Sequence, residues 1–404
     1  MRRSTIRSLG CSASNPLSRS CLPARPCTSG RAACRHGSSV SPTRRSGAAG
    51  VLSRVHRLLV TIESMVDTEE QTLMGLLDDE LSFDPTTTDA LTNHLPMALL
   101  AKSRLGADAD ELLRFKAKYQ RRLQPLKGSE RQLDQSNWTS GVGRRGAATD
   151  LRHYFARSIA EHGVDGVLRT HLSALLAGIG GGAFHGVIRL SYALDSASPA
   201  RIAAGLAYLA EVGDALGPLR DRRPASDGVS EIANALSRSD PPLSVPKGWN
   251  IGERMREVAG DERFQDAVGS LQFTDDTESQ LAEFSLRLFA TSGDFTSLHG
   301  VTGMAAVSSI RPWVEDVVAL DRYTAQALLA AYVTLGAPPI WSQSRLDEFV
   351  SLDQSSVADV AAVGASSDDE HVSKLIYTAH TRWTESDNPL YLAVAARHAG
   401  LSDS

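Results

Sequence analysis

Four histidines stand in sequence contexts that differ from those of the other histidines in this 404-residue chain. They are His94 in Asn-His-Leu-Pro-Met, His185 in Gly-Gly-Ala-Phe-His-Gly, His299 in Ser-Leu-His-Gly, and His371 in Asp-Glu-His-Val-Ser-Lys. Small residues adjoin three of them, which leaves room for a ligand or another helix to approach. Neutral imidazoles bind iron, zinc, copper and nickel alike. Each histidine could equally be a hydrogen-bonded core residue, so the pattern leaves both roles open.

Helical spacing determines which side chains accompany His185. Arg189 and Tyr192 follow it at i+4 and i+7, so one stripe of a helix presents all three side chains. A guanidinium at this position can pair with a phenolate or with an acidic side chain near the site. Arg189 and Tyr192 are therefore our candidate catalytic residues.

Lys374 follows His371 at i+3 and lies on the same helical face. An ammonium group has no lone pair and is repelled by a nearby cation, so a lysine that faces a metal must lose its proton. A lysine deprotonated by burial can add CO2 to form a carbamate, which is an oxygen ligand resembling a carboxylate. The alternative is a surface lysine whose aliphatic stem lies along apolar neighbours.

Other side chains near these histidines are candidates for binding a substrate or for orienting a histidine. Phe184, Trp313 and Met97 are candidates to bind an aromatic substrate, with core packing as the alternative role. Asp294 and Asp369 are candidates to orient histidines. Because Asp369 stands at a predicted helix start, capping of that helix is its alternative role.

The elements that must position these residues are helices. Apolar residues recur at helical spacing along most of the chain after residue 64, and alanine and leucine, both strong helix formers, dominate it. Alternating Val/Ile/Thr runs joined by Asn-Gly or Asp-Gly turns, which would indicate hairpins, are absent. We predict an all-α fold with one large helical domain over residues 65–404. The predicted helices lie around Leu95–Leu105, Leu112–Phe115, 182–194, Ile202–Val212, Phe284–Phe289, 295–320 with a break near Pro312, 322–335, 368–383 and 389–399.

Residues 215–250 are dense in proline and glycine and are predicted to form a long central connection. Because the four histidines fall on both sides of it, we expect one domain and not two independent modules.

A glycine-rich stretch at residues 178–183 matches the G-x-G-x-x-A pattern of dinucleotide-binding proteins. That motif requires a preceding strand within a βαβ unit. Here Leu172–Ala177 continues a helical pattern, so we reject the motif. NADPH, if the protein uses it as a reductant, would be an external partner without a binding motif in this chain.

The charge of the chain is divided unevenly. Residues 1–64 hold eleven arginines, no lysine and one acidic residue, which sum to +10. The whole chain has 42 basic and 47 acidic residues, so residues 65–404 hold 31 and 46 and sum to −15. The basic head has the composition of a targeting segment or of upstream sequence before a start at Met65, and in either case we expect it to be disordered.

The acidic body is a poor candidate for binding nucleic acid, which requires clustered Lys and Arg. All four cysteines lie in the head, so a metal site in the body must use nitrogen and oxygen ligands. The uncharged stretch of residues 170–188 carries two histidines and five glycines and does not resemble a membrane span. We expect a cytoplasmic protein without nucleic-acid or membrane partners.

The four histidine segments, in this order, resemble the questin oxidase-like family. The segment Gly-Ala-Phe-His-Gly-Val-Ile-Arg-Leu around His185 is the most specific, and the resemblance covers roughly residues 75–400. It implies a mostly helical fold and a non-haem Fe(II) site with four histidines and a carboxylated lysine as ligands. The matching positions are His94, His185, His299, His371 and Lys374. It also implies that O2 oxidises or cleaves an anthraquinone-type aromatic polyketide, with a Baeyer–Villiger-type step among the outcomes.

Three functions fit these residues. The first, which we expect, is an iron-dependent mono- or dioxygenase acting on a small aromatic substrate. The second is a zinc-dependent hydrolase or lyase that uses the same ligands to acidify a bound water. The third is a non-catalytic helical protein that binds a flat aromatic ligand.

Overall fold

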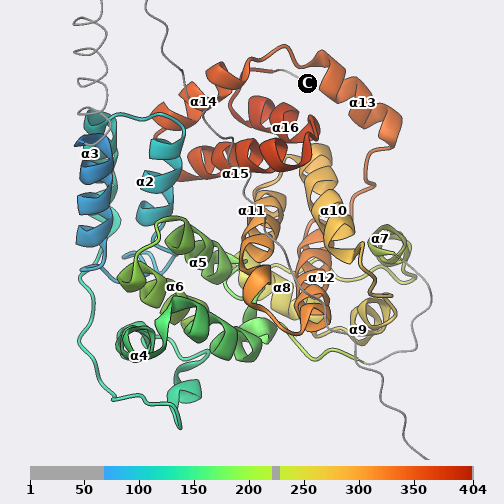
Figure 1. The fold of residues 1–404 in the computed structure, drawn as a ribbon. Helices are drawn as coiled ribbons and strands as arrows, with labels where there is room; N and C mark the ends of the chain where they lie inside the picture. The colour runs from blue at the N-terminus through green and yellow to red at the C-terminus, as the bar shows by residue number, and fades with distance from the viewer. Residues whose placement is uncertain (1–67, 221–227, 403–404) are drawn as a thin grey trace, which may run out of the picture. The chain divides into compact units, whose positions relative to one another are not determined.

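A computed structural model describes residues 68–220 and 228–402, and these residues form a helical domain (Figure 1). The described residues form no sheet, and their β pairing is limited to the isolated bridges Phe83–Pro125 and Thr86–Thr92. The predicted all-α fold is therefore confirmed. The predicted disorder of the head, residues 1–64, concerns residues outside the described part of the chain. Among the described helices, none is long and apolar enough to cross a bilayer.

The helices follow one another closely along the described chain. Residues 68–80 form the first described helical stretch. The later elements are α2 Leu95–Arg104, α3 Ala109–Tyr119, η1 Gln120–Arg122, η2 Trp138–Gly141, α4 Ala148–Leu175, η3 Leu176–Gly178, α5 His185–Asp195, α6 Pro199–Glu211, α7 Val229–Ser237, α8 Ile251–Ala259, α9 Glu262–Gly269, α10 Thr277–Ser292, α11 Phe295–Ile310, η4 Arg311–Trp313, α12 Val317–Thr334, α13 Gln343–Leu352, α14 Val357–Ser366, α15 Glu370–Ser386 and α16 Leu390–His398.

The helix predicted over residues 295–320 is shorter than expected. Helix α11 ends at Ile310 and continues only as the 3₁₀ turn η4, which contains Pro312. Helix α12 then begins at Val317, five residues before the predicted start, because the Asp316 carboxylate accepts a hydrogen bond from the Ala319 N–H. Pro312 and the capping Asp316 together determine where α11 ends and α12 begins.

The prediction of a long connection over residues 215–250 is wrong for residues 229–237, which form a helix. Helix α7 occupies Val229–Ser237 and buries Val229, Ile232 and Leu236, which are spaced by three and four residues along one face. This short apolar stripe lies between proline-rich segments, and their composition obscured it. Residues 221–227 of the predicted connection lie outside the described part of the chain.

Four of the helices pack together around the histidines. Helix α5 contacts α6 and α11, while α15 contacts α2 and α11 (Figure 1). Two glycines allow close approach: a Cβ at Gly186 would lie 2.9 Å from the Leu209 Cα of α6, and a Cβ at Gly303 would lie 2.5 Å from the Phe184 Cγ. Bulkier residues at these positions would separate the helices.

The glycine-rich stretch at residues 178–183 follows a helix. Helix α4 ends at Leu175 and η3 covers Leu176–Gly178, so no strand precedes the glycines. A Cβ at Gly181 would lie 2.1 Å from the Val212 carbonyl oxygen, which shows how closely the stretch packs against the chain after α6. The glycines thus serve packing within the helical domain, in agreement with our rejection of the dinucleotide motif.

Candidate metal centre

The four histidines singled out by their contexts meet in one cluster. The ring centroids of His94 and His185 are 4.8 Å apart, those of His185 and His299 are 4.7 Å apart, and those of His371 and His94 are 4.7 Å apart. The rings of His299 and His371, 5.6 Å apart, close the circuit. Each histidine comes from a different helix: His94 directly precedes α2, His185 begins α5, and the other two lie on α11 and α15.

Hydrogen bonds fix the orientation of three of these rings. Nδ1 of His185 donates to the Gly182 carbonyl oxygen at 2.5 Å, and Nδ1 of His299 donates to the Phe295 carbonyl oxygen at 2.7 Å. Nδ1 of His371 lies 3.1 Å from the Asp369 carboxylate. Because Nδ1 carries the proton in these arrangements, Nε2 keeps its lone pair. Such outer hydrogen bonds are typical of metal-binding histidines.

The Nε2 atoms of these three histidines are buried and have no hydrogen-bond partner within the described residues. A buried polar atom without a partner costs free energy, and three in neighbouring rings are unusual for a folded protein. A bound metal ion would satisfy all three lone pairs. The imidazole donors therefore fit a divalent first-row metal, and their chemistry is compatible with iron and with zinc.

The described surroundings keep the imidazoles neutral. Burial, together with the nearby charge of Lys374, lowers the pKa of His185 to about 3. Burial also lowers the pKa values of His94, His299 and His371. At neutral pH all four rings are therefore in the deprotonated form that metal binding requires.

Lys374 lies inside the cluster, with its Nζ atom 3.2 Å from Nδ1 of His94. Its side chain is almost completely buried, with 2% of its surface exposed, so the surface alternative does not hold. Burial lowers the pKa of Lys374 to about 7, while the carboxylates of Glu370 and Asp369 oppose this shift. A substantial fraction of the amine is therefore neutral near physiological pH.

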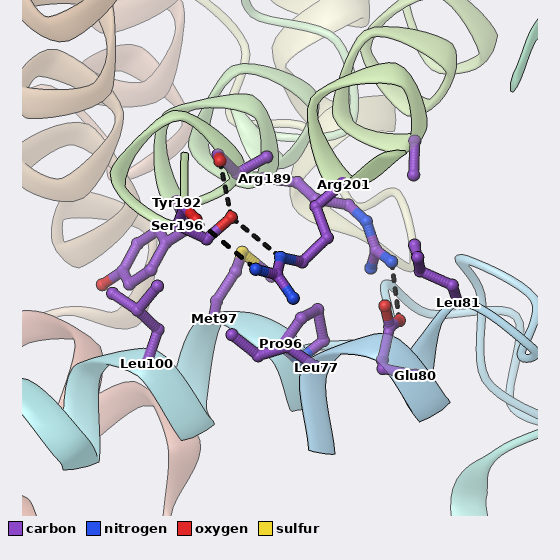
Figure 2. Close-up of a pocket in the computed structure, with 12 residues that line it drawn as sticks. Leu77, Glu80, Leu81, Pro96, Met97, Leu100, Arg189, Tyr192, Ser196 and Arg201 are labelled. Carbon is purple, nitrogen blue, oxygen red and sulfur yellow. Dashed lines mark hydrogen bonds and ion pairs between the residues drawn. The ribbon is translucent and has the colours of Figure 1, made fainter. Parts of the chain in front are cut away.

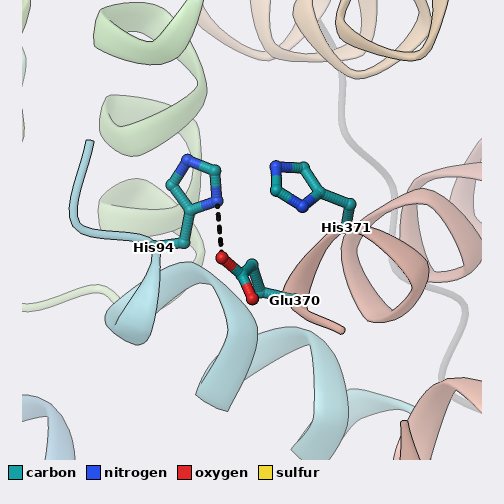
Figure 3. A group of neighbouring side chains, drawn as sticks. All are labelled: His94, Glu370 and His371. Atoms are coloured by element: carbon teal, nitrogen blue, oxygen red, sulfur yellow. Dashed lines mark ion pairs between the residues drawn. The ribbon is translucent and has the colours of Figure 1, made fainter. Parts of the chain in front are cut away.

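Glu370 is a site residue that the sequence did not single out. Its carboxylate lies 3.7 Å from Nδ1 of His94 and accepts a hydrogen bond from Arg122 at 2.8 Å. With His94 and His371 it forms a group whose potential ligand atoms all lie within 4.8 Å of one another (Figure 3). Its position directly before His371 was the available signal, but acidic residues are common in the first turn of any helix.

The two candidate orienting aspartates lie in different environments. Asp369 caps α15 by accepting the backbone N–H of His371 and also contacts the ring of that histidine, so it fills both roles that the sequence left open. The hydrogen bonds from His371 lower the pKa of Asp369 to about 2. Asp294 caps α11 through the Thr296 N–H at 2.6 Å. Within the described residues, no hydrogen bond joins Asp294 to a histidine side chain.

Arg189, Tyr192 and Met97 line one pocket together, between residues 77–81, α2, α5 and α6 (Figure 2). None of the four histidines lines this pocket. Arg189 is buried, pairs with Glu80 at 2.6 Å and donates to the Asn93 carbonyl oxygen at 2.9 Å. Burial raises the pKa of Tyr192, so its phenol stays protonated. Arg189 therefore reaches the cluster only indirectly, by holding the residue before His94.

Neither Phe184 nor Trp313 lines that pocket. Phe184 is buried, adopts a left-handed backbone conformation with φ of 66° directly before α5, and packs against Gly303. Trp313 donates its indole N–H to Asp165 at 2.9 Å. It follows His299 by 14 residues, which is about 20 Å along a helix at about 1.5 Å per residue. The structure does not bring Trp313 to the cluster.

Comparison with known proteins adds a family and one relative. A family model described as Questin oxidase-like matches residues 91–379, a range that includes the four histidines and Lys374. The Baeyer-Villiger oxidase AgnL3 of Paecilomyces divaricatus is 27% identical over 188 residues, which cover 41% of this chain and 41% of that relative. The chain thus spans less than half the length of the curated relative that it matches.

Proposed function

The chain belongs to the questin oxidase-like family, and from this premise we propose that it is an oxidoreductase that uses O2 at a non-haem Fe(II) site to oxidise or ring-cleave an anthraquinone-type aromatic polyketide. Three buried, unpartnered imidazole nitrogens in one cluster of four histidines carry this proposal. The name of the matched relative, a Baeyer-Villiger oxidase, supports the proposed class of reaction.

His94, His185, His299 and His371 would hold the metal through their neutral imidazoles. Lys374 would supply an oxygen ligand as a carbamate: the neutral amine forms an N–C bond to CO2 and releases one proton. Its burial and lowered pKa support this step, since only the neutral amine reacts. Glu370 offers a second carboxylate beside His94.

Bound Fe(II) would supply electrons to O2, and an electron-rich phenolic substrate would supply the others. The chain's own residues prepare the site. Burial keeps water from the three unpartnered Nε2 atoms, and Gly182, Phe295 and Asp369 hold their rings in the tautomer with a free Nε2. Arg189 fixes the backbone before His94 through the Asn93 carbonyl oxygen, which makes it a positioning residue in this proposal. Any NADPH would act as an external reductant.

Metal analysis of the full chain, purified without oxygen, tests the proposal. We expect about one equivalent of iron and substrate-dependent O2 uptake, with both lost in His185→Ala. The matched control is His380→Ala, because His380 contacts Trp383 on α15 and lies outside the cluster. Zinc without O2 uptake would favour the hydrolase or lyase. A metal-free protein whose ligand binding is unchanged in His185→Ala would favour the non-catalytic binding protein.

A further inference from the structure

An exposed phenyl ring lies directly against two of the clustered histidines. Phe295 is the first residue of α11, and 51% of its surface is exposed. Its ring centroid is 4.6 Å from that of His299 and 4.6 Å from that of His371, in edge-to-face geometry at 73° and 66°. In the described part of the chain, it is the only non-histidine aromatic ring that pairs with a histidine ring of the cluster.

Phe295 is held on a rigid element. The Asp294 carboxylate caps α11 directly before it, and the Phe295 carbonyl oxygen accepts the Nδ1 proton of His299 at 2.7 Å. The same residue therefore orients one histidine through its backbone and contacts two histidines through its side chain. The side chain of His371 is 14% exposed, so the cluster reaches the surface beside this phenyl ring.

The other aromatic and apolar candidates cannot offer a comparable surface. Phe184 and Met97 are fully buried, and Trp313 lies about 20 Å along the chain from His299 by helical rise. A shield over the histidines would require only an apolar side chain, whereas Phe295 is an aromatic residue with 51% of its surface exposed. Aromatic rings pair favourably at centroid separations of about 4.5–7 Å, beyond the effect of their buried area.

Resting on the proposed function, we propose that Phe295 is the platform on which a flat, hydroxylated aromatic substrate stacks, and that it is a determinant of substrate binding. A substrate ring stacked on Phe295 would lie against the ring that contacts His299 and His371. The chemical class is a fused planar ring system of the anthraquinone or anthraquinol type. Such a ligand would cover part of the Phe295 surface that is exposed in the free protein.

The test measures binding of 1,8-dihydroxyanthraquinone to the full-length, metal-free protein by absorbance titration, so that no turnover contributes. We expect Phe295→Leu to weaken binding about 2- to 10-fold, because it keeps apolar area and loses the aromatic face. Phe295→Tyr keeps the ring and should bind within about twofold of the wild type. The matched control is Leu352→Ala at the end of α13, which removes an equally exposed apolar side chain elsewhere.

Thermal unfolding and iron content of each variant separate stacking from shielding. Unchanged probe affinity in Phe295→Leu together with lost iron would overturn the platform and make Phe295 a cover for the metal. No binding of the probe to the wild type would also overturn it. A third outcome separates this proposal from the proposed function. If Phe295→Leu weakens binding of the probe but the wild type holds no iron and takes up no O2, Phe295 remains the binding platform and the proposed function is wrong.

Discussion

The amine nitrogen of Lys374 lies 3.2 Å from Nδ1 of His94, although 280 residues separate them in sequence. The contact joins the start of α2 to the first turns of α15, and both side chains are buried. If Lys374 were permanently charged, its ammonium group would lie among the imidazoles. Among the described residues, no carboxylate forms a hydrogen bond with it. The relationship therefore predicts that the protonation of Lys374 affects both stability and metal binding.

Stability of the metal-free protein should depend on pH through Lys374. Its folded-state pKa of about 7 lies below the ordinary value of 10.5, so between these pH values the unfolded chain binds the extra proton. The free energy of unfolding should therefore rise with pH across this window, by up to about 1.4 kcal/mol per unit. Denaturant titrations at pH 7 and pH 9 should show a smaller rise for Lys374→Met than for the wild type. The exposed Lys118→Met is the control, and equal pH dependence in both variants would contradict the buried amine.

Metal binding should stabilise the fold, because the donors from four helices come together only in the folded chain. Free Fe(II) at about 100 to 1,000 times its Kd should raise the free energy of unfolding by about 3–4 kcal/mol. Anaerobic thermal unfolding with and without a chelator measures this difference. His299→Ala should abolish the shift and His380→Ala should retain it. A shift of equal size in His299→Ala would place the metal elsewhere.

Glu370 should contribute to metal affinity through its position beside His94. Outer carboxylates that orient ligands typically change metal affinity about 10- to 100-fold, and we expect a loss in this range for Glu370→Ala. Competition with a chromogenic chelator gives the affinity. Glu385→Ala is the matched control because Glu385 lies on the same helix and pairs only with the nearby Arg382 among the described residues. Similar affinities in both variants would remove Glu370 from the site.

Close packing of α11 against Phe184 should make Gly303 intolerant of substitution. A Cβ at this position would lie 2.5 Å from the Phe184 Cγ, so Gly303→Ala should destabilise the protein by about 1–3 kcal/mol. The double variant Gly303→Ala with Phe184→Leu should recover part of this loss, as a double-mutant cycle would measure. Gly75→Ala is the control, since nothing lies within 4 Å of its added Cβ. Additive effects of the two substitutions would contradict the predicted clash.

Local features of the sequence were sufficient to predict the helices that carry the histidines. The position of Pro96 in the first turn of α2 and the apolar spacing of α5 depend on neighbours within one or two turns. The same reasoning could not locate α7, whose short apolar stripe is flanked by prolines. Its buried face becomes recognisable only against the helices that cover it.

Partners that are distant in sequence account for what the sequence missed at the site. Arg189 was placed correctly on the helix of His185, but its partner Glu80 lies 109 residues earlier and draws the guanidinium away from the rings. Phe295 precedes His299 by one helical turn, yet its contact with His371 depends on how α11 packs against α15. Periodicity identifies the face of a helix and does not identify the neighbour that the face meets.

The cluster draws on helices from α2 to α15, so it cannot exist while the chain is only partly synthesised. His94, His185 and His299 emerge from the ribosome well before His371 and Lys374, and the circuit of rings closes only when α15 docks against α2. A metal held by this cluster would crosslink the helices that are synthesised first to α15, which is synthesised last among the helices that carry donors. Metal loading would then mark the final step of assembly, and translation arrested before α15 would leave an open set of donors.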